Sequence, residues 1–326
     1  MHVIVSGGTG FLGRHLCRRL HFEGHNVTAL GRDLQIGADL EKEGIAFRPI
    51  DLVQPLSDDG FRTLCADAFV HAAALSSAWG RSADFMAANV DGTRNALNLA
   101  RRAGVRRFVF VSTPSLYFCF ADQEGIAETA SLPRPVNAYA ASKRAAEQLV
   151  LATAELGPVV LRPRAIYGPG DGALLPRLVR AAQAGPLPLL RGGRAVTNLT
   201  YVDDVVSAIV MSLGDDPALS GQVVNIANPE VLPVRSIIEQ AAKRVGVGVR
   251  WRPLPWPIAY GGVRMLEGLA RLHPRCPEPP LTAYGLGILA FSQTLDTTKA
   301  VRLLGFVPRV PFGEGLERTF DRQAES

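Results

Sequence analysis

The chain has 326 residues, of which 47% are hydrophobic and 20% charged, and its formal net charge is +5. This composition excludes a disordered protein, and the length fits one large α/β domain with a smaller lobe rather than one small core. The arginines are dispersed instead of forming a basic run, so we expect no nucleic acid partner.

The chain opens with an apolar, β-branched run at His2–Ser6, which predicts a strand. A glycine-rich turn and then leucines at helical spacing follow it. In a dinucleotide-binding unit of this kind, Gly7 permits the tight turn, Gly10 lets the backbone approach a pyrophosphate, and Gly13 lets the helix pack against the strand. The alternative is an ordinary glycine-rich turn. The predicted cofactor residues here are Gly7, Thr9, Gly10, Phe11, Leu12 and Gly13.

The second predicted strand, residues 26–30, ends in Gly31, Arg32 and Asp33. About 20 residues past the last glycine of the turn, a carboxylate binds the 2′-hydroxyl of NAD, whereas an arginine accepts the 2′-phosphate of NADP. Arg32 comes first and Asp33 one place later, so NADP(H) is favoured and NAD(H) is the alternative. The competing interpretation is that Arg32 is a solvated loop charge.

Further strands are predicted at residues 45–50, 68–74, 107–112 and 159–163, with helical segments between them. This alternation predicts an α/β fold, a Rossmann-type doubly wound parallel sheet with a smaller C-terminal substrate lobe. Ligands of such sheets bind beyond the carboxyl ends of the strands. The residues predicted at those ends are Asp51, Leu52, Ala72, Ala73, Ala74, Ser112 and Thr113.

The sequence changes character after Tyr167, which suggests a boundary between two parts of the chain. We expect a dinucleotide-binding domain at 1–168, a returning segment at about 195–228, and a substrate lobe formed mainly by 169–326. Within the second part, residues 177–184 predict a helix and residues 195–200 an extended segment.

The acidic pair Asp203 and Asp204 precedes a predicted helix at residues 205–213. Aspartate before an apolar helical run is typical of a helix N-cap. A metal site is the alternative interpretation, and we predict none.

Residues 251–291 are rich in proline and apolar side chains. The pattern within them predicts an amphipathic surface helix packed on the core. A lid over an apolar substrate and a helix on a membrane surface, with peripheral membrane contact, are the alternatives. The apolar face carries Ile258, Met265, Leu266, Leu269 and Leu272, and the opposite face carries Arg264, Glu267 and Arg271.

The four cysteines, Cys17, Cys65, Cys119 and Cys276, show no Cys-x-x-Cys spacing. We expect them to be reduced in a cytoplasmic protein. The chain begins with a strand instead of a charged segment and an apolar run, so we expect no signal peptide. Its apolar stretches fall short of the ~20 residues that a membrane span needs.

Tyr139 and Lys143 are four residues apart in a stretch that reads as helix, which places both on one face, one turn apart. A free tyrosine titrates near pH ~10. A fixed neighbouring cation favours the phenolate, so the pair is expected to work as an acid/base group. A single Tyr-x-x-x-Lys spacing often occurs by chance, so its catalytic role depends on the other motifs of the chain.

Together these motifs resemble the extended short-chain dehydrogenase/reductases over nearly the whole chain. The resemblance implies that Thr113, Tyr139 and Lys143 form the catalytic set and that Asn89 supports the structure near the cofactor. It also implies that Pro163, Arg164, Ala165 and Ile166 pass beside the nicotinamide. The matching segments are residues 7–13, 71–74, 89–93, 111–117, 139–143 and 161–170.

Within that family the chain resembles the 3β-hydroxysteroid dehydrogenase-like branch, which includes bacterial 2-alkyl-3-oxoalkanoate reductases. Sugar-nucleotide epimerases carry an arginine that clamps the substrate diphosphate where this chain has Thr197, although Arg194 lies three positions earlier. The acidic pair of dehydratases is replaced by Pro114 and Ser115, so dehydration is not expected.

The resemblance implies an NAD(P)-dependent oxidoreductase that interconverts a secondary alcohol and a ketone on a lipophilic substrate. The predicted substrate residues are Ser76, Trp79, Thr113, Ser115 and Tyr167, whereas Tyr117 is expected to pack in the core. A sugar-nucleotide epimerase with tightly bound NAD and a non-catalytic dinucleotide-binding protein are the alternatives. Members of the family often form homodimers through the helices that bear the tyrosine motif.

Overall fold

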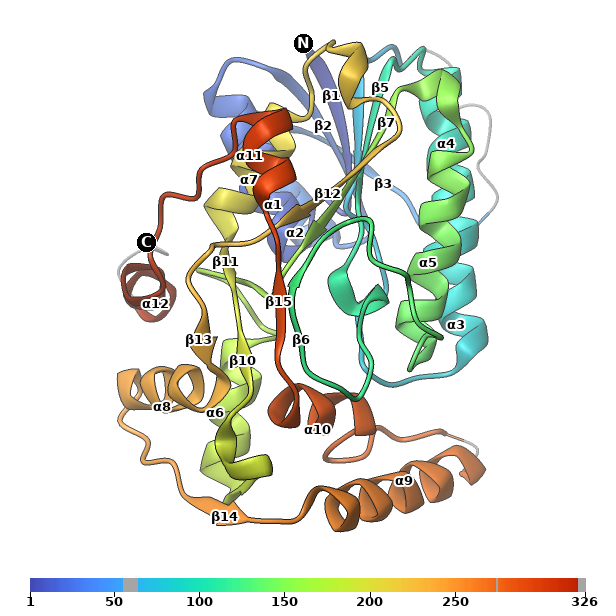
Figure 1. The fold of residues 1–326 in the computed structure, drawn as a ribbon. Helices are drawn as coiled ribbons and strands as arrows, with labels where there is room; N and C mark the ends of the chain where they lie inside the picture. The colour runs from blue at the N-terminus through green and yellow to red at the C-terminus, as the bar shows by residue number, and fades with distance from the viewer. Residues whose placement is uncertain (55–63, 274, 322–326) are drawn as a thin grey trace.

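The computed structural model describes residues 1–54, 64–273 and 275–321 (Figure 1). Its centre is a seven-stranded sheet in the order β12-β7-β5-β4-β1-β2-β3, in which all neighbouring strands are parallel. The prediction of a Rossmann-type sheet is confirmed. The strands are β1 (His2–Ser6), β2 (Asn26–Gly31), β3 (Ala46–Pro49), β4 (Ala68–His71), β5 (Arg107–Val111), β7 (Pro158–Pro163) and β12 (Gln222–Ile226).

Helices cover both faces of this sheet (Figure 1). Successive side chains of a strand point to opposite faces, so Val3 and Val5 join one apolar core and Ile4 the other. The core of Val3 includes residues of α1 (Phe11–Phe22), α2 (Leu34–Lys42), α7 (Val202–Met211), α11 (Thr298–Leu304) and α12 (Phe312–Phe320). The core of Ile4 includes residues of α4 (Gly92–Arg102) and α5 (Ala138–Leu151), and α3 (Ser82–Met86) packs on α5.

The smaller lobe lies below the carboxyl ends of the large sheet in the view of Figure 1. Its four-stranded sheet has the order β13 (Leu232–Pro233), β10 (Val196–Thr197), β15 (Gln293–Leu295) and β6 (Gln123–Ile126). Two small parallel pairs join β8 (Ile166–Tyr167) to β11 (Thr200–Tyr201) and β9 (Leu187–Leu189) to β14 (Trp251–Pro253). The lobe helices are α6 (Leu175–Ala184), α8 (Val234–Arg244), α9 (Trp256–Leu272) and α10 (Ala283–Ala290).

Short helical turns complete the described structure. One is a π-helical segment, Ala87–Asp91, between α3 and α4. The others are 3₁₀ turns at Pro114–Leu116, Ala154–Leu156, Arg191–Gly193 and Pro217–Leu219.

The two parts of the chain are interleaved more than the sequence predicted. Strand β6 comes from the first 168 residues but lies in the sheet of the lobe, because it pairs with β15. The returning segment is also divided: β12 joins the large sheet, whereas the predicted extended stretch at 195–200 supplies β10 and β11 to two smaller sheets.

The predicted cap of the helix after residue 204 is wrong. Helix α7 begins at Val202 after Tyr201, so Asp203 and Asp204 lie in its first turn and neither is the N-cap. The Asp204 carboxylate instead accepts hydrogen bonds from the backbone N–H groups of Arg309 and Val310, at 2.8 and 3.3 Å. Asp204 therefore fastens the C-terminal segment to the helix.

Helix α9 packs on an apolar cluster of the lobe, but not through the apolar face that the sequence pattern defines. On that face Ile258 is 66% exposed and Leu272 is 82% exposed. The buried residues are Ala259, Val263 and Glu267, and the partly buried rings of Trp256 and Tyr260 pack on the same cluster. The Glu267 carboxylate caps the following helix, because it accepts a hydrogen bond from the N–H of Ala283 at 2.8 Å.

Candidate active site

The turn between β1 and α1 has no room for side chains. Gly7 has a φ of 73°, and a Cβ there would lie 2.7 Å from the backbone nitrogen of Ala73. A Cβ on Gly13 would lie 2.0 Å from the carbonyl oxygen of Gly7. Glycine at both positions therefore brings α1 close to the strand and leaves the N-terminus of the helix open to an anionic group.

A cavity of about 520 Å³ opens at this turn. Phe11, Leu12 and Gly13 begin α1 beside it. Bare glycine backbone and small alanine side chains let a flat, extended molecule lie against the carboxyl edge of the sheet, so these residues fit a dinucleotide. The lining includes the predicted cofactor residues Gly7, Thr9, Gly10, Arg32, Asp51, Leu52, Ala72, Ala73 and Ala74.

The side chains of Arg32 and Asp33 differ in their hydrogen bonds. The Asp33 carboxylate is the N-cap of α2 and accepts hydrogen bonds from the N–H groups of Gln35 and Ile36, at 3.1 and 3.0 Å. Arg32 is exposed and lines the cavity. Both residues line the cavity, and the Asp33 carboxylate also has a role in the fold as the cap of α2.

Asn89 connects the cavity wall to the helix that carries the predicted acid/base pair. Its Oδ1 accepts a hydrogen bond from the N–H of Leu75 at 2.7 Å, and its Nδ2 donates to Ser142 Oγ at 2.9 Å. Ser142 immediately precedes Lys143 on α5. The buried Asn89 side chain therefore fixes α5 against the loop that follows β4.

The predicted catalytic residues converge at the end of β5. Thr113 follows β5, and the Tyr139 phenol on α5 is hydrogen-bonded to it. The Thr113 hydroxyl also donates to Ser115 Oγ at 3.0 Å, and Ser115 Oγ lies 2.7 Å from the phenolic oxygen of Tyr284. A chain of hydroxyl groups thus links the phenols of Tyr139 and Tyr284.

Lys143 lies on α5, one turn after Tyr139. Its Nζ donates to the carbonyl oxygen of Val111 at 2.8 Å and lies 4.0 Å from the centre of the Phe110 ring. Burial lowers the pKa of Lys143 to about 7, and the nearby Glu147 carboxylate partly opposes this shift.

The expected direction of the Tyr139 shift is wrong. Burial raises the pKa of Tyr139 to about 12, and the hydrogen bond with Thr113 only partly offsets the effect. The reason is that desolvation disfavours the phenolate more than the surrounding groups stabilise it. The phenol is therefore protonated at neutral pH and is a proton donor in its resting form.

A buried ion pair supports α5 one turn after Lys143. The guanidinium of Arg162 on β7 binds the Glu147 carboxylate, and both side chains are about 5% exposed or less. Ser112 Oγ donates to the same carboxylate at 2.6 Å. Tyr117 is fully buried, contacts Arg162 and donates to Asn225 at 3.1 Å, so its predicted packing role agrees with the structure.

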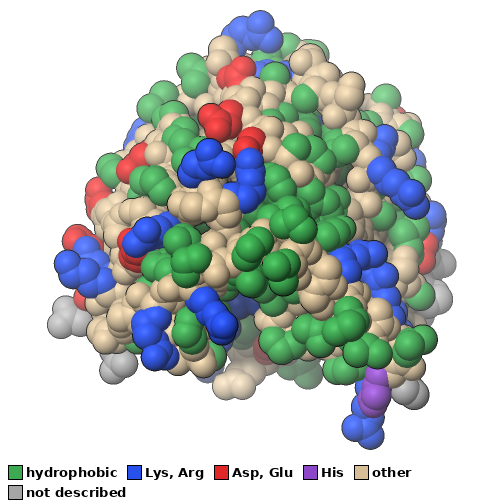
Figure 2. Space-filling view, turned by 60° about the horizontal axis from the view of Figure 1, so that its bottom comes forward, with side chains coloured by type: hydrophobic (Ala, Val, Ile, Leu, Met, Phe, Trp, Pro, Cys, Tyr) green, Lys and Arg blue, Asp and Glu red, His purple; other side chains and the backbone are tan. Residues whose placement is uncertain are grey.

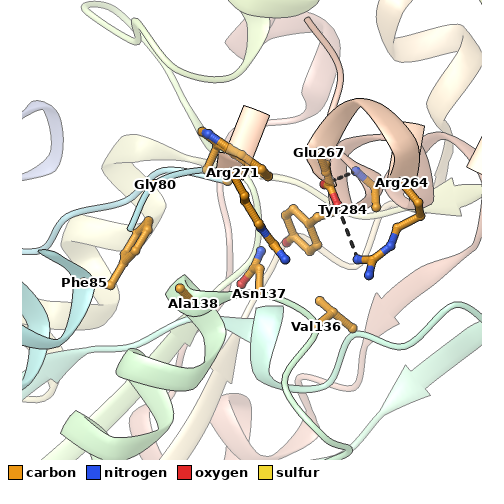
Figure 3. Close-up of a pocket in the computed structure, with 12 residues that line it drawn as sticks. Gly80, Phe85, Val136, Asn137, Ala138, Arg264, Glu267, Arg271 and Tyr284 are labelled. Carbon is orange, nitrogen blue, oxygen red and sulfur yellow. Dashed lines mark hydrogen bonds and ion pairs between the residues drawn. The ribbon is translucent and has the colours of Figure 1, made fainter. Parts of the chain in front are cut away.

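A second, enclosed pocket of about 40 Å³ lies between the start of α5 and the helices α9 and α10 (Figure 3). Trp79 lines it, and the Trp79 indole donates to the carbonyl oxygen of Cys276 at 3.1 Å. Figure 3 shows Arg271 extending from α9 toward Asn137. The Asn137 Nδ2 group is buried without a hydrogen-bond partner among the described residues. A polar ligand atom would satisfy it.

Not every predicted site residue reaches these cavities. Tyr167 is only 2% exposed and packs between Tyr201 and Phe312, with ring centres 5.6 Å from each, so the prediction that it contacts substrate is corrected. Ser76 is exposed on the loop after β4. Pro163 ends β7 and Ile166 begins β8, with Ala165 between them at a φ of 45°.

The side chain of Arg164 turns toward the lobe instead of the dinucleotide cavity. Its Nε and Nη2 donate to Thr197 Oγ1 at 3.1 and 2.9 Å, and the residue is 6% exposed. It lies close enough to Tyr284 for the two to interact electrostatically. Within residues 1–54, 64–273 and 275–321, the structure shows no carboxylate paired with this buried guanidinium.

The sequence did not reveal Tyr284 or Asn137 as site residues. Tyr284 is in a helix more than a hundred residues after the tyrosine motif, and only the folded lobe brings it to Ser115. Asn137 carries a local signal, because its Oδ1 caps α5 by accepting from the N–H of Ala140 at 2.8 Å. Its unpaired Nδ2 is visible only in the structure.

The fold and this set of residues define an NAD(P)-dependent enzyme of the short-chain dehydrogenase/reductase type. The model of the NAD dependent epimerase/dehydratase family matches residues 3–227. The chain belongs to this family.

Similar proteins point to reductases. The chain is 35% identical to a 2-alkyl-3-oxoalkanoate reductase of Stenotrophomonas maltophilia over 98% of each chain. It is 32% identical to a 4-hydroxy-2-methyl-3-oxo-4-farnesyl-3,4-dihydroquinoline-1-oxide ketoreductase of Stigmatella aurantiaca, over 97% of this chain and 95% of that one. The structure of UDP-glucuronic acid 4-epimerase from Bacillus cereus in complex with NAD matches with a TM-score of 0.75 at 22% identity, over 98% of each chain. This last likeness concerns the fold.

Proposed function

We propose that the protein transfers hydride between a nicotinamide dinucleotide and the carbonyl or carbinol carbon of a lipophilic substrate. The observation that carries this proposal is the convergence of Thr113, Tyr139 and Lys143 at the carboxyl edge of a dinucleotide-type sheet. The two relatives described above are a reductase and a ketoreductase. A bound nicotinamide would supply or accept the hydride, and the chain supplies the proton and the orientation.

In the reducing direction, Tyr139 donates its phenolic proton to the carbonyl oxygen as negative charge develops there. Thr113 donates a hydrogen bond to the same oxygen and so stabilises that charge. Lys143, whose Nζ already contacts the backbone at Val111, would hold the ribose hydroxyls beside the nicotinamide. Burial raises the pKa of Tyr139 to about 12, so its phenol holds the proton that reduction requires at neutral pH.

The cofactor is NADP(H) in this proposal. Arg32 lines the large cavity at the end of β2, where an arginine would accept a 2′-phosphate, and the Asp33 carboxylate is engaged as a helix cap. The comparison of kcat/KM for NADPH and NADH tests this point, since equal values or a preference for NADH would reject it.

In this proposal the substrate carries a negative charge. Arg164 supports this, because a guanidinium buried without a carboxylate partner is expected to bind an anionic ligand. Of the two relatives, one is named for a 3-oxoalkanoate and the other for a farnesyl-bearing dihydroquinoline oxide. A single buried cation matches one carboxylate, so a lipophilic 3-oxo acid is the substrate class that we infer.

The experiment is an NADPH-oxidation assay with a 2-alkyl-3-oxo acid, its methyl ester, a steroid ketone and a UDP-sugar. We expect the acid to be the best substrate. Turnover of the UDP-sugar without net change in NADPH would instead favour epimerisation, and absence of turnover with every ketone would reject the proposal.

We also propose that the enzyme is located in the cytoplasm. All four cysteines are unpaired, which suits a reducing compartment. Among the described residues, no helix is long and apolar enough to cross a membrane. A homodimer through α5, the helix that bears Tyr139 and Lys143, is also proposed, and light scattering would test it.

A further inference from the structure

Helix α9 presents an apolar stripe to solvent along one edge of the molecule. The stripe consists of Ile258, Met265, Leu266, Leu269 and Leu272, which are 66%, 65%, 45%, 59% and 82% exposed. Figure 2 shows hydrophobic side chains gathered on this side of the molecule, with basic side chains beside them. Large apolar side chains on one face of a helix, exposed together, mark an interaction surface.

The charges around the stripe have one sign. The segment from Arg250 to Cys276 contains five arginines and a single acidic residue, Glu267. Glu267 is 5% exposed, and its carboxylate is held by Arg264 and the N–H of Ala283. The exposed surface of the segment is therefore apolar and cationic. The five arginines, all exposed, are Arg250, Arg252, Arg264, Arg271 and Arg275. Arg264 and Arg271 also line the pocket on the other side of the helix, so Arg250, Arg252 and Arg275 are the ones free of that pocket.

These charges favour an anionic bilayer over a second copy of the chain. A twofold contact through α9 would place the arginines of both copies against each other, and the only acid of the segment is buried. A lipid surface with anionic headgroups complements the arginines and takes up the apolar side chains at the same time.

We propose that the apolar stripe of α9 docks on an anionic membrane surface, with α9 lying in the plane of the headgroups. The opposite side of the same helix lines the enclosed pocket through Arg264, Glu267 and Arg271 (Figure 3). One helix thus separates the pocket from the membrane.

Co-sedimentation with vesicles tests this inference without any assay of turnover. Binding to vesicles of phosphatidylcholine with roughly 30% phosphatidylglycerol is compared with binding to vesicles of pure phosphatidylcholine. Basic segments respond to anionic lipid of this order. We expect binding to the anionic vesicles that weakens with salt. Leu269→Glu with Leu272→Glu is expected to lower binding by at least about tenfold.

The matched control is Phe22→Glu with Val307→Glu, which adds the same charges at exposed apolar positions outside the stripe, 88% and 64% exposed. The decrease in vesicle binding caused by this control should be less than about half of the decrease caused by the α9 variant. Unfolding midpoints show whether each variant is folded. Absence of binding by the parent chain, equal loss in both variants, or a dimer that only the α9 variant abolishes would overturn the inference. Each of these outcomes is independent of whether a ketone is reduced.

Discussion

At the scale of single residues, the Tyr139 phenol is the proton donor of the proposed reaction. Its pKa of about 12 keeps it protonated near neutral pH, and its partner Thr113 fixes its direction. Replacing Tyr139 with Phe should lower kcat for ketone reduction by about 10²–10⁴-fold, because general acid catalysis is lost. The Kd for NADPH should change little. Tyr117→Phe, at a buried phenol outside the proposed chemistry, is the control and should retain kcat.

Lys143 predicts a pH dependence of stability. Its pKa is lowered from 10.5 to about 7 in the folded protein, so the unfolded chain binds a proton that the folded chain does not between these values. The free energy of unfolding, relative to that of Lys143→Met, should therefore fall as the pH drops from 10.5 to 7. Urea denaturation of both proteins at several pH values measures this difference, and a flat difference would contradict the shift.

Arg164 predicts specificity for a charged substrate. Arg164→Met should raise KM for the 3-oxo acid about tenfold or more, because a hydrogen bond to a charged group is worth ~1.5–3 kcal/mol. KM for the methyl ester should stay within about twofold. Arg194→Met is the matched control at an exposed arginine. Equal effects on acid and ester would show that Arg164 has only a structural role.

Sequence reasoning located residues whose chemistry depends on local spacing. The glycine turn and the Tyr139–Lys143 pair belong to single segments, so their geometry follows from a helix or a turn. The pKa direction of Tyr139 did not follow, since burial by the lobe dominates it. Tyr284 and the orientation of Arg164 also depend on how the lobe folds over the sheet.

At the scale of elements, the close packing of the turn between β1 and α1 leaves no room for an added methyl group. Gly13→Ala would place a Cβ 2.0 Å from the Gly7 carbonyl oxygen, so the helix must shift. We expect a loss of about 1–3 kcal/mol in the free energy of unfolding and weaker NADPH binding. The control Gly261→Ala, in α9 with no atom within 4 Å of the added Cβ, should leave NADPH binding unchanged.

Helix α9 shows what an amphipathic pattern leaves open. The sequence correctly separated an apolar face from the face of Arg264, Glu267 and Arg271. It did not decide which face turns inward, because that depends on the partner surface. Here Glu267 is buried, since it caps α10 at Ala283, and the leucines remain outside.

At the scale of the whole molecule, the parallel sheet was predictable because helices alternate with most of its strands along the chain. Apolar runs separated by helical segments specify a parallel sheet with covered faces. The lobe was less predictable, because its strands are two to four residues long and pair across large sequence separations, such as β6 with β15. Short strands carry too little pattern to be recognised.

The large sheet and the lobe meet where Thr113, Ser115 and Tyr284 are linked by hydrogen bonds. This junction is the place where a ketone would meet both the acid and the nicotinamide. The most direct measurement is mass spectrometry of the product formed from a 2-alkyl-3-oxo acid and NADPH that carries deuterium at both C4 positions. The account predicts an alcohol with one deuterium on the carbinol carbon, formed by the parent chain and lost in Tyr139→Phe. An unlabelled alcohol, or equal labelled product from the variant, would contradict it.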